Sequence, residues 1–163
     1  MCVIQLKVVH RTHYTKAKLS RMFPNTNDSC YRCLYSPADH THTFYSCPKL
    51  ANYWNNFFDT LSAVFGFHVA PCPLIAIFGV SPSAGKFSKY QANVMAFASV
   101  IARRRILLHW KKSTPPASTS WLKDLLSFIH LEKIKYSTRD LLNNFYRTWD
   151  PFLLYINSLD SID

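Results

Sequence analysis

The chain has 163 residues, with 19 Lys and Arg against 9 Asp and Glu, and a formal net charge of +10. This length allows one domain with a sizeable core, and the charge favours a polyanionic partner such as the phosphate backbone of a nucleic acid. An odd set of five cysteines argues against a disulfide scaffold, and no stretch approaches the roughly 18 consecutive apolar residues of a membrane span. We therefore expect an intracellular protein, cytoplasmic or nuclear, with no membrane partner.

Residues 1–23 form a basic and aromatic segment. Thr15 can cap a short helix from Lys16 to Met22, and Pro24 ends it. The segment is either a solvated helix face or a contact surface, and the sequence leaves both open. Its basic and aromatic side chains are His10, Arg11, His13, Tyr14, Lys16, Lys18 and Arg21.

The most specific motif follows in residues 25–48, which we call the metal module. Cys30, Cys33, His42 and Cys47 have the spacing C-x2-C-x8-H-x4-C. Three thiolates and one imidazole are the ligands of a closed tetrahedral zinc site, which leaves no position for a reactive water and is therefore structural. We expect the first pair on a tight turn and the second on a short helix. His40 is an alternative to His42 as the fourth ligand.

Basic and aromatic residues lie within and just after the metal module. We expect Tyr31, Arg32, Tyr45 and Lys49 to offer stacking and phosphate contacts to RNA or another single-stranded nucleic acid. Residues 1–50 thus form a first unit, a basic segment plus a CCHC zinc-binding module. The sequence gives no role to Cys2 or Cys72.

Helical patterns dominate the rest of the chain. Apolar residues at three- and four-residue spacing predict a helix from Pro48 to Phe65 that stops at Gly66. Residues 74–80 are a short apolar run, either extended or a single helical turn. A long helix is predicted over residues 87–112. The stretch before it resembles a phosphate-binding loop, but Phe87 follows Lys86 where that loop requires Ser or Thr.

The long predicted helix ends in a basic run. Arg103, Arg104 and Arg105 are consecutive and therefore spread over about 200° of the helix circumference, so at least one must point sideways or toward the apolar stripe. The run can contact phosphates, or it can simply complement the negative end of the helix dipole. The predicted phosphate-contacting residues here are Arg103, Arg104, Arg105, Trp110, Lys111 and Lys112.

The C-terminal third continues the helical pattern. Thr119 or Ser120 can cap a helix that buries Trp121 and Ile129, and a pair of shorter helices is predicted over residues 131–136 and from Ser137 onward. Pro151 should break the pattern, leaving residues 152–156 as a last turn. We predict a mainly α fold, in which residues 51–163 form a helical C-terminal domain.

Several segments resemble the carboxy-terminal region of the reverse-transcriptase polyprotein of non-LTR (LINE-type) retrotransposons. The resemblance covers nearly the whole chain and is most specific in the metal module and the Ser-Cys-Pro-Lys-Leu run that ends at Leu50. The segments that carry it are Arg11–Pro24, Cys30–Cys33, His42–Trp54, Ile75–Gly79, Ile101–Arg105, His109–Lys111, Thr114–Pro116 and Trp121–Leu122.

This resemblance implies that Cys30, Cys33, His42 and Cys47 bind zinc, with His42 favoured over His40. It implies binding of the element's RNA during target-primed reverse transcription, with the polymerase part of the polyprotein as a further partner. The family's polymerase carries a Tyr-x-Asp-Asp turn, and this chain has no adjacent Asp pair. We therefore expect a non-catalytic tail that lacks polymerase and endonuclease. The alternative is a helical structural or protein-interaction domain stapled by zinc, a decayed fragment without independent function.

Overall fold

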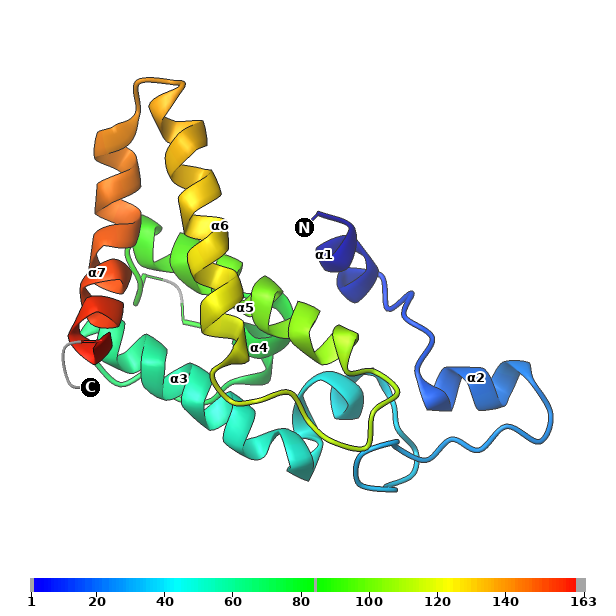
Figure 1. Cartoon of the computed structure of the whole chain (residues 1–163). Coiled ribbons are helices and arrows are strands. Elements are labelled where there is room, and N and C mark those ends of the chain that lie inside the picture. The colour runs from blue at the N-terminus through cyan, green and yellow to red at the C-terminus, as the bar shows by residue number, and fades with distance from the viewer. Residues whose placement is uncertain (1, 84, 161–163) are drawn as a thin grey trace.

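The computed structural model describes residues 2–83 and 85–160, without the side chains of Cys2 and Asp160. Within these residues the fold is helical and contains no strand, which confirms the predicted mainly α fold with a loop-built cysteine and histidine cluster (Figure 1). Two short turns, π-helical η1 and 3-10 η2, precede the long helices. The elements in chain order are α1 (Cys2–Val9), α2 (Lys16–Met22), η1 (His42–Ser46), η2 (Pro48–Leu50), α3 (Ala51–Phe65), α4 (Pro73–Phe78), α5 (Lys89–Leu108), α6 (Ser120–Ser137) and α7 (Leu142–Asp160).

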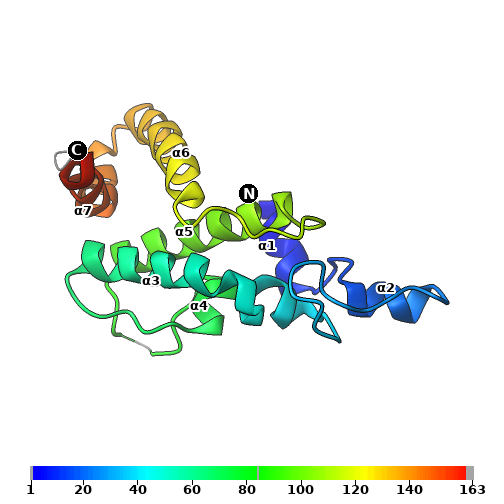
Figure 2. The ribbon, with the colours of Figure 1, turned by 60° about the horizontal axis from the view of Figure 1, so that its bottom comes forward.

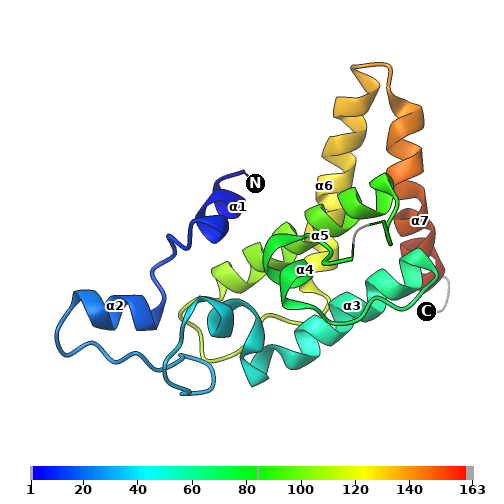
Figure 3. The same ribbon diagram turned by 180° about the vertical axis from the view of Figure 1, so that it is seen from behind.

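Helices α3 to α7 pack together into what we call the helical body. Figures 1 and 3 show α3 running along α5, with α4 against them and the α6–α7 hairpin rising from one end. Large apolar side chains from different helices fill the interior, as the hydrophobic effect requires of amphipathic helices this long. Among the bulkiest fully buried ones are Phe57, Phe58, Trp121, Phe145, Trp149 and Phe152.

The metal module and α2 occupy the opposite end of the molecule from the α6–α7 hairpin (Figures 1 and 2). Phe44 and Leu50 are completely buried and join the same core cluster as the helical body. The indole N–H of Trp54 in α3 donates to the carbonyl of Phe44 at 2.9 Å. The module is therefore attached to the body through the shared core around Phe44 and Leu50, through packing of η1 on α3 and α4, and through this hydrogen bond at the start of α3. The predicted boundary at residue 50 stays a prediction, because the buried cluster is continuous across it.

A close approach at Gly79 and the hydrogen bonds of Arg103 hold helix α4 between α1 and α5. Gly79 ends α4 at a φ of 70°, and a Cβ built there would lie 2.9 Å from the Cα of Ala96 in α5, so only glycine allows this approach. Arg103 of α5 donates to the carbonyl of Ala76 at 3.1 Å and to that of Ile77, which satisfies carbonyls at the end of α4. Its guanidinium also donates to Gln5 of α1.

Several element boundaries differ from those predicted. The sequence leaves the run 74–80 open between an extended segment and a helical turn, and its residues 74–78 lie in the short helix α4. Helix α1 was not predicted. Helix α5 starts later, because Ser88 forms a capping box with Gln91, and it ends at Leu108, which leaves Trp110 and the lysines after it outside the helix. Helix α6 runs unbroken to Ser137, so the separate helix predicted over residues 131–136 is part of it.

Helix α7 passes through Pro151, where a break was predicted. A proline inside a helix costs about 3 kcal/mol, because it removes one hydrogen bond and crowds the preceding turn. Trp149 and Phe152 flank it and are 1% and 0% exposed. Burying two such side chains contributes about 1.5–3 kcal/mol each, enough to offset the proline. The tertiary contacts of α7 therefore outweigh the local signal.

Candidate metal centre

The first two predicted ligands are presented by a tight turn. The backbone N–H of Leu34 donates to the carbonyl of Cys30 at 3.0 Å, and Leu34 adopts a left-handed φ of 62°. The N–H of Cys30 donates to the carbonyl of Tyr35 at 2.8 Å, which closes the turn from the other side. The N–H of Arg32 points at the Cys30 sulfur, 3.4 Å away. The two-residue spacing thus places both thiols on one side of the loop, as predicted.

The other two ligands lie at the two ends of η1. His42 begins this π-helical turn, and the N–H of Cys47 donates to the His42 carbonyl at 3.2 Å. Asp39 accepts the backbone N–H of His42 at 2.7 Å through its carboxylate. The ring of Tyr35 stacks on the His42 imidazole at 4.9 Å with an interplanar angle of 14°. Asp39 thus fixes the backbone of His42, and the stacked ring of Tyr35 restricts the orientation of its imidazole.

The four ligand atoms converge on one point. The atoms of Cys30, Cys33, His42 and Cys47 all lie within 4.8 Å of one another. The sulfurs of Cys30 and Cys47 are 3.9 Å apart, and the Cys33 sulfur is 3.2 Å from Nε2 of His42. Zinc–sulfur bonds are about 2.3 Å long and zinc–nitrogen bonds about 2.0–2.1 Å. In a tetrahedral site, two ligand sulfurs are therefore about 3.8 Å apart, and a sulfur and a nitrogen are about 3.5 Å apart. The cluster could hold a metal ion, and its geometry is compatible with zinc.

Burial and neighbouring groups shift the pKa values of the ligands in different directions. Cys30, His42 and Cys47 are buried, and Cys33 is partly exposed. Burial disfavours the Cys30 thiolate, yet hydrogen bonds from the backbone of Arg32 and Cys33 lower its pKa overall, whereas burial raises the pKa of Cys33. Burial, and then the charge of Arg32, lowers the pKa of His42 and keeps it neutral, as a ligand must be. A bound cation would replace the protons on these sulfurs.

His40 is not part of this cluster. Among the described residues, the only group of three or more His, Cys, Asp or Glu that could share an ion contains His42. The His40 ring instead packs on Phe44 at 4.8 Å, and its Nε2 atom is buried without a hydrogen-bond partner. The alternative that the sequence left open is therefore decided by the fold in favour of His42.

The predicted contacts around the module are placed unevenly. Tyr31 is 38% exposed and Lys49 is exposed, so both are accessible. Tyr45 is partly buried against Trp54 at 5.9 Å. Arg32 is 6% exposed and donates to the carbonyl of Thr43, which ties the two halves of the module together. Its predicted phosphate contact is therefore wrong in this conformation, because the guanidinium has almost no surface.

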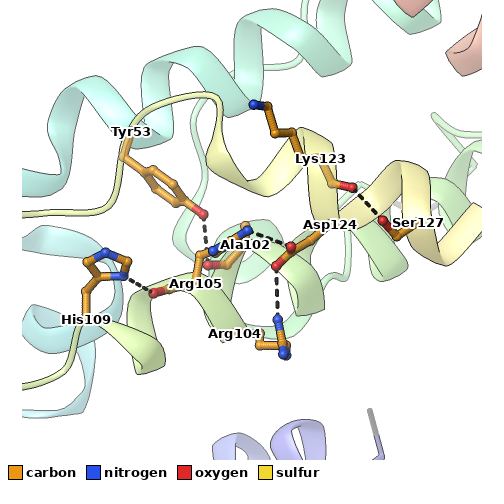
Figure 4. A network of polar contacts seen from close by, with 8 residues as sticks. All are labelled: Tyr53, Ala102, Arg104, Arg105, His109, Lys123, Asp124 and Ser127. Carbon is orange, nitrogen blue, oxygen red and sulfur yellow. Dashed lines mark hydrogen bonds and ion pairs between the residues drawn. The ribbon is translucent and has the colours of Figure 1, made fainter.

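Each arginine of the run on α5 makes a contact within the protein, although the side chain of Arg104 stays 45% exposed. Arg103 has no exposed surface, which contradicts its predicted phosphate contact and confirms that one of the three arginines points inward. Arg104 and Arg105 both pair with the carboxylate of Asp124 in α6, at 3.0 and 2.6 Å (Figure 4). Figure 4 also shows Tyr53 donating to the carbonyl of Ala102 at 2.9 Å beside this pair. The arginine run thus mainly connects α5 to α4 and α6.

The residues after α5 lie nearer to the module. Trp110 packs on Phe44 at 5.6 Å and, with Tyr31 and Arg32, lines a small cavity of about 10 Å³, room for about one water molecule. Lys111 and Lys112 are exposed. The structure therefore brings Tyr31, Arg32 and Trp110 together although they are far apart in sequence, while Arg103 to Arg105 belong to the separate connection of α5 to α4 and α6.

The sequence analysis missed the residues that support the ligands. Asp39, three residues before His42, has the spacing at which a side-chain carboxylate accepts a backbone N–H, so it carried a usable local signal. The stacking of Tyr35 on His42 and the pairing of Asp124 with two arginines carried none, because both depend on how distant segments fold together.

No protein-family model matches this chain. Among the described residues, no helix is both long and apolar enough to cross a membrane. The side chain of Cys2 lies outside the described residues, and Cys72 is partly exposed and stands apart from the metal cluster.

Proposed function

We propose that this chain is a zinc-stabilised module that binds single-stranded nucleic acid, with RNA as its natural ligand, and that it carries no catalytic step. The observation that carries the proposal is the Cys30, Cys33, His42 and Cys47 cluster in a chain with a net charge of +10. Four protein ligands complete a tetrahedral shell and leave no position for an attacking water, so zinc would order the loops. The excess positive charge would then attract a phosphate backbone.

The resemblance to the carboxy-terminal region of LINE-type reverse transcriptases supports the same proposal from the sequence side. In that setting the ligand is the RNA of the element, and the polymerase portion of the polyprotein is the partner in the same chain. The predicted contact residues that are exposed and form no ion pair among the described residues are Tyr31, Lys49, Lys111 and Lys112, and Arg104 is exposed but pairs with Asp124.

The test starts with zinc content. Zinc per purified chain should be one for the unmodified protein and should fall for Cys33→Ser and His42→Gln. Cys72→Ser and His40→Gln are matched controls, because each changes the same residue type outside the cluster. A zinc content below one in the unmodified chain, or equal loss in the controls, contradicts the metal part of the proposal.

The second half of the test is binding of a labelled single-stranded RNA by the zinc-loaded chain. For a nucleic-acid binder, the logarithm of the association constant falls linearly with the logarithm of the salt concentration, by about 0.7 per phosphate contacted. Binding should be lost together with zinc in Cys33→Ser and kept in Cys72→Ser. Full zinc content without RNA binding at low salt contradicts the nucleic-acid part.

One observation favours a second candidate, a structural or protein-interaction domain stapled by zinc. Three arginines expected to meet phosphates have partners within the protein: buried Arg103 donates to α4 carbonyls, and the partly exposed Arg104 and Arg105 pair with Asp124. A domain of this kind would hold one zinc and show no salt-dependent binding of RNA. The same two measurements therefore separate the candidates.

A further inference from the structure

A polar pocket of about 380 Å³ lies between the basic segment and the metal module. Its volume falls in the range of about 300–1,000 Å³ that is usual for ligand sites. One wall comes from residues 11–21 and the other from residues 39–41, immediately before His42. The two walls are held together by the backbone N–H of Ala17, which donates to the carbonyl of Ala38 at 3.2 Å. The residues that line it and bear on binding are Arg11, His13, Lys18, Arg21, Asp39 and His40.

The pocket is strongly positive. Arg11, Lys18 and Arg21 bring three cationic side chains to it, and among the described residues none of the three forms an ion pair. Asp39 is the one acid in the lining, and its carboxylate already accepts the N–H of His42 at 2.7 Å. Charges of one sign gathered in a concave surface focus the field and attract a counter-ion of the opposite sign. The positive charge of the pocket therefore favours an anion as its ligand.

Two histidines add polar groups that have no partner in the protein. His13 and His40 line the pocket, and Nε2 of each is buried without a hydrogen bond among the described residues. Both rings pack on Phe44, at 5.3 and 4.8 Å. Burial lowers the pKa of His13 to about 4, so this ring is neutral near pH 7 and carries one N–H. Buried polar nitrogens without partners are costly unless something hydrogen-bonds to them.

Two exposed tyrosines flank α2. The ammonium of Lys18 lies 5.2 Å from the ring centre of Tyr14, and that of Lys16 lies 4.9 Å from the ring centre of Tyr31. Tyr14 is 58% exposed and Tyr31 is 38% exposed. Alternating cations and exposed rings are the arrangement by which proteins hold single strands, because phosphates meet the charges while unpaired bases stack on the rings. A duplex, whose bases are already stacked, would gain little from the tyrosines.

We propose that the pocket formed by Arg11, Lys18 and Arg21 binds a backbone phosphate of single-stranded RNA, with Tyr14 available to stack a neighbouring base. This inference rests on the proposed function and gives it a location that the sequence did not assign. Asp39 links the pocket to the metal centre, because it supplies part of the pocket wall and hydrogen-bonds the backbone of a ligand, His42. Ordering of the module by its ion would therefore also shape the pocket.

The test compares two variants that remove the same number of positive charges. Lys18→Gln/Arg21→Gln removes two from the pocket, and Lys123→Gln/Lys133→Gln removes two exposed lysines from α6, at the other end of the molecule (Figure 2). The probe is a fluorescein-labelled 12-nucleotide oligo(U) RNA, and its anisotropy is titrated with the zinc-loaded full chain from 50 mM to 1 M salt. Zinc per chain is measured in both variants as a check that they fold.

The pocket contacts one phosphate, so the pocket variant should lower the salt slope by about 0.7. If the variant and the unmodified chain bind equally at 1 M salt, this slope change weakens binding about eightfold at 50 mM salt. The α6 variant should change affinity by less than about threefold. If the pocket variant loses zinc, Arg11→Gln, which lies outside α2 on the same wall, replaces it, and the salt slope should fall by at most about 0.7.

If the two double variants weaken RNA binding equally, the pocket is not the phosphate site. The proposed function then still holds, provided that the unmodified chain binds RNA in a zinc-dependent way. No RNA binding by the unmodified chain overturns both. A 12-base-pair RNA duplex that binds as tightly, with the same loss in the pocket variant, overturns the single-strand assignment. If an oligo-glutamate peptide binds as tightly as the RNA and loses binding in the pocket variant, the pocket is a docking site for acidic proteins, and the RNA assignment is overturned.

Discussion

The metal module and the helical body are stabilised by different physical means. In residues 25–48 the buried apolar side chains other than the cysteines are only Ala38 and Phe44, whereas the body buries aromatic residues from each of α3, α6 and α7. A loop with so little apolar burial cannot offset the conformational entropy of ordering it. The module therefore depends on its four ligands, and the body does not. Changes confined to the module and changes confined to the body should therefore have separable effects.

Removal of the metal should have the largest effect. Structural zinc in small peptides contributes on the order of 10 kcal/mol of apparent free energy, so a strong chelator should unfold the module. Hydrogen exchange should then become fast at the amides of Cys30 and Cys47, which are bonded inside the module. Amides in the middle of α3 and α6 should stay protected. Uniform loss of protection would show that the two regions fold as one unit.

The reverse experiment removes a large side chain from the body. Trp121 is completely buried and packs on Phe57 at 5.0 Å, so Trp121→Ala should lower the free energy of unfolding by about 3–5 kcal/mol. Urea denaturation in excess zinc measures the change. Below the unfolding transition, zinc content should remain that of the unmodified chain. A folded variant that lacks zinc would mean that the module needs the body to bind its ion.

The arginine run offers a comparison within α5. Arg103→Met leaves Gln5 and the carbonyls of α4 without their donor, and it should lower the free energy of unfolding by about 1–3 kcal/mol. Arg104→Met removes a partly exposed ion pair with Asp124 and should lower the free energy of unfolding by at most about 1 kcal/mol. Urea denaturation of both compares them directly. RNA binding should be unchanged in Arg103→Met, and a large loss there would restore this residue as a nucleic-acid contact.

The smallest predicted effect concerns the start of α5. Ser88 caps this helix, and its side chain accepts the N–H of Gln91 at 3.2 Å. Ser88→Ala should lower the free energy of unfolding by about 1 kcal/mol. Thr15→Ala, which removes the corresponding cap of α2, should barely change the stability of the body, because α2 lies beside the module. An equal effect of the two on body stability, measured by urea denaturation, would contradict the separation of the regions.

The metal centre was predictable because its information is local. All four ligands fall between residues 30 and 47, and a tight turn plus one helical turn is enough to bring them together. The helices α3, α5 and α6 were predictable for the same reason, since their apolar spacing and capping residues are read over short windows. The amino acids alone also fixed the positive charge of the chain and the presence of two basic clusters.

Only the tertiary structure decided which basic cluster remains available. The sequence favoured Arg103 to Arg105, but α4 and Asp124 meet these side chains from segments 19 to 27 residues away. The same applies to Pro151, where buried aromatic neighbours outweigh the local tendency to break the helix. Arg11, Lys18 and Arg21, by contrast, meet no acidic partner that pairs with them among the described residues, and they are gathered by the docking of α2 on the module. Whether a charged side chain is used inside the protein or left for a ligand depends on what packs opposite it, and that is a property of the folded chain.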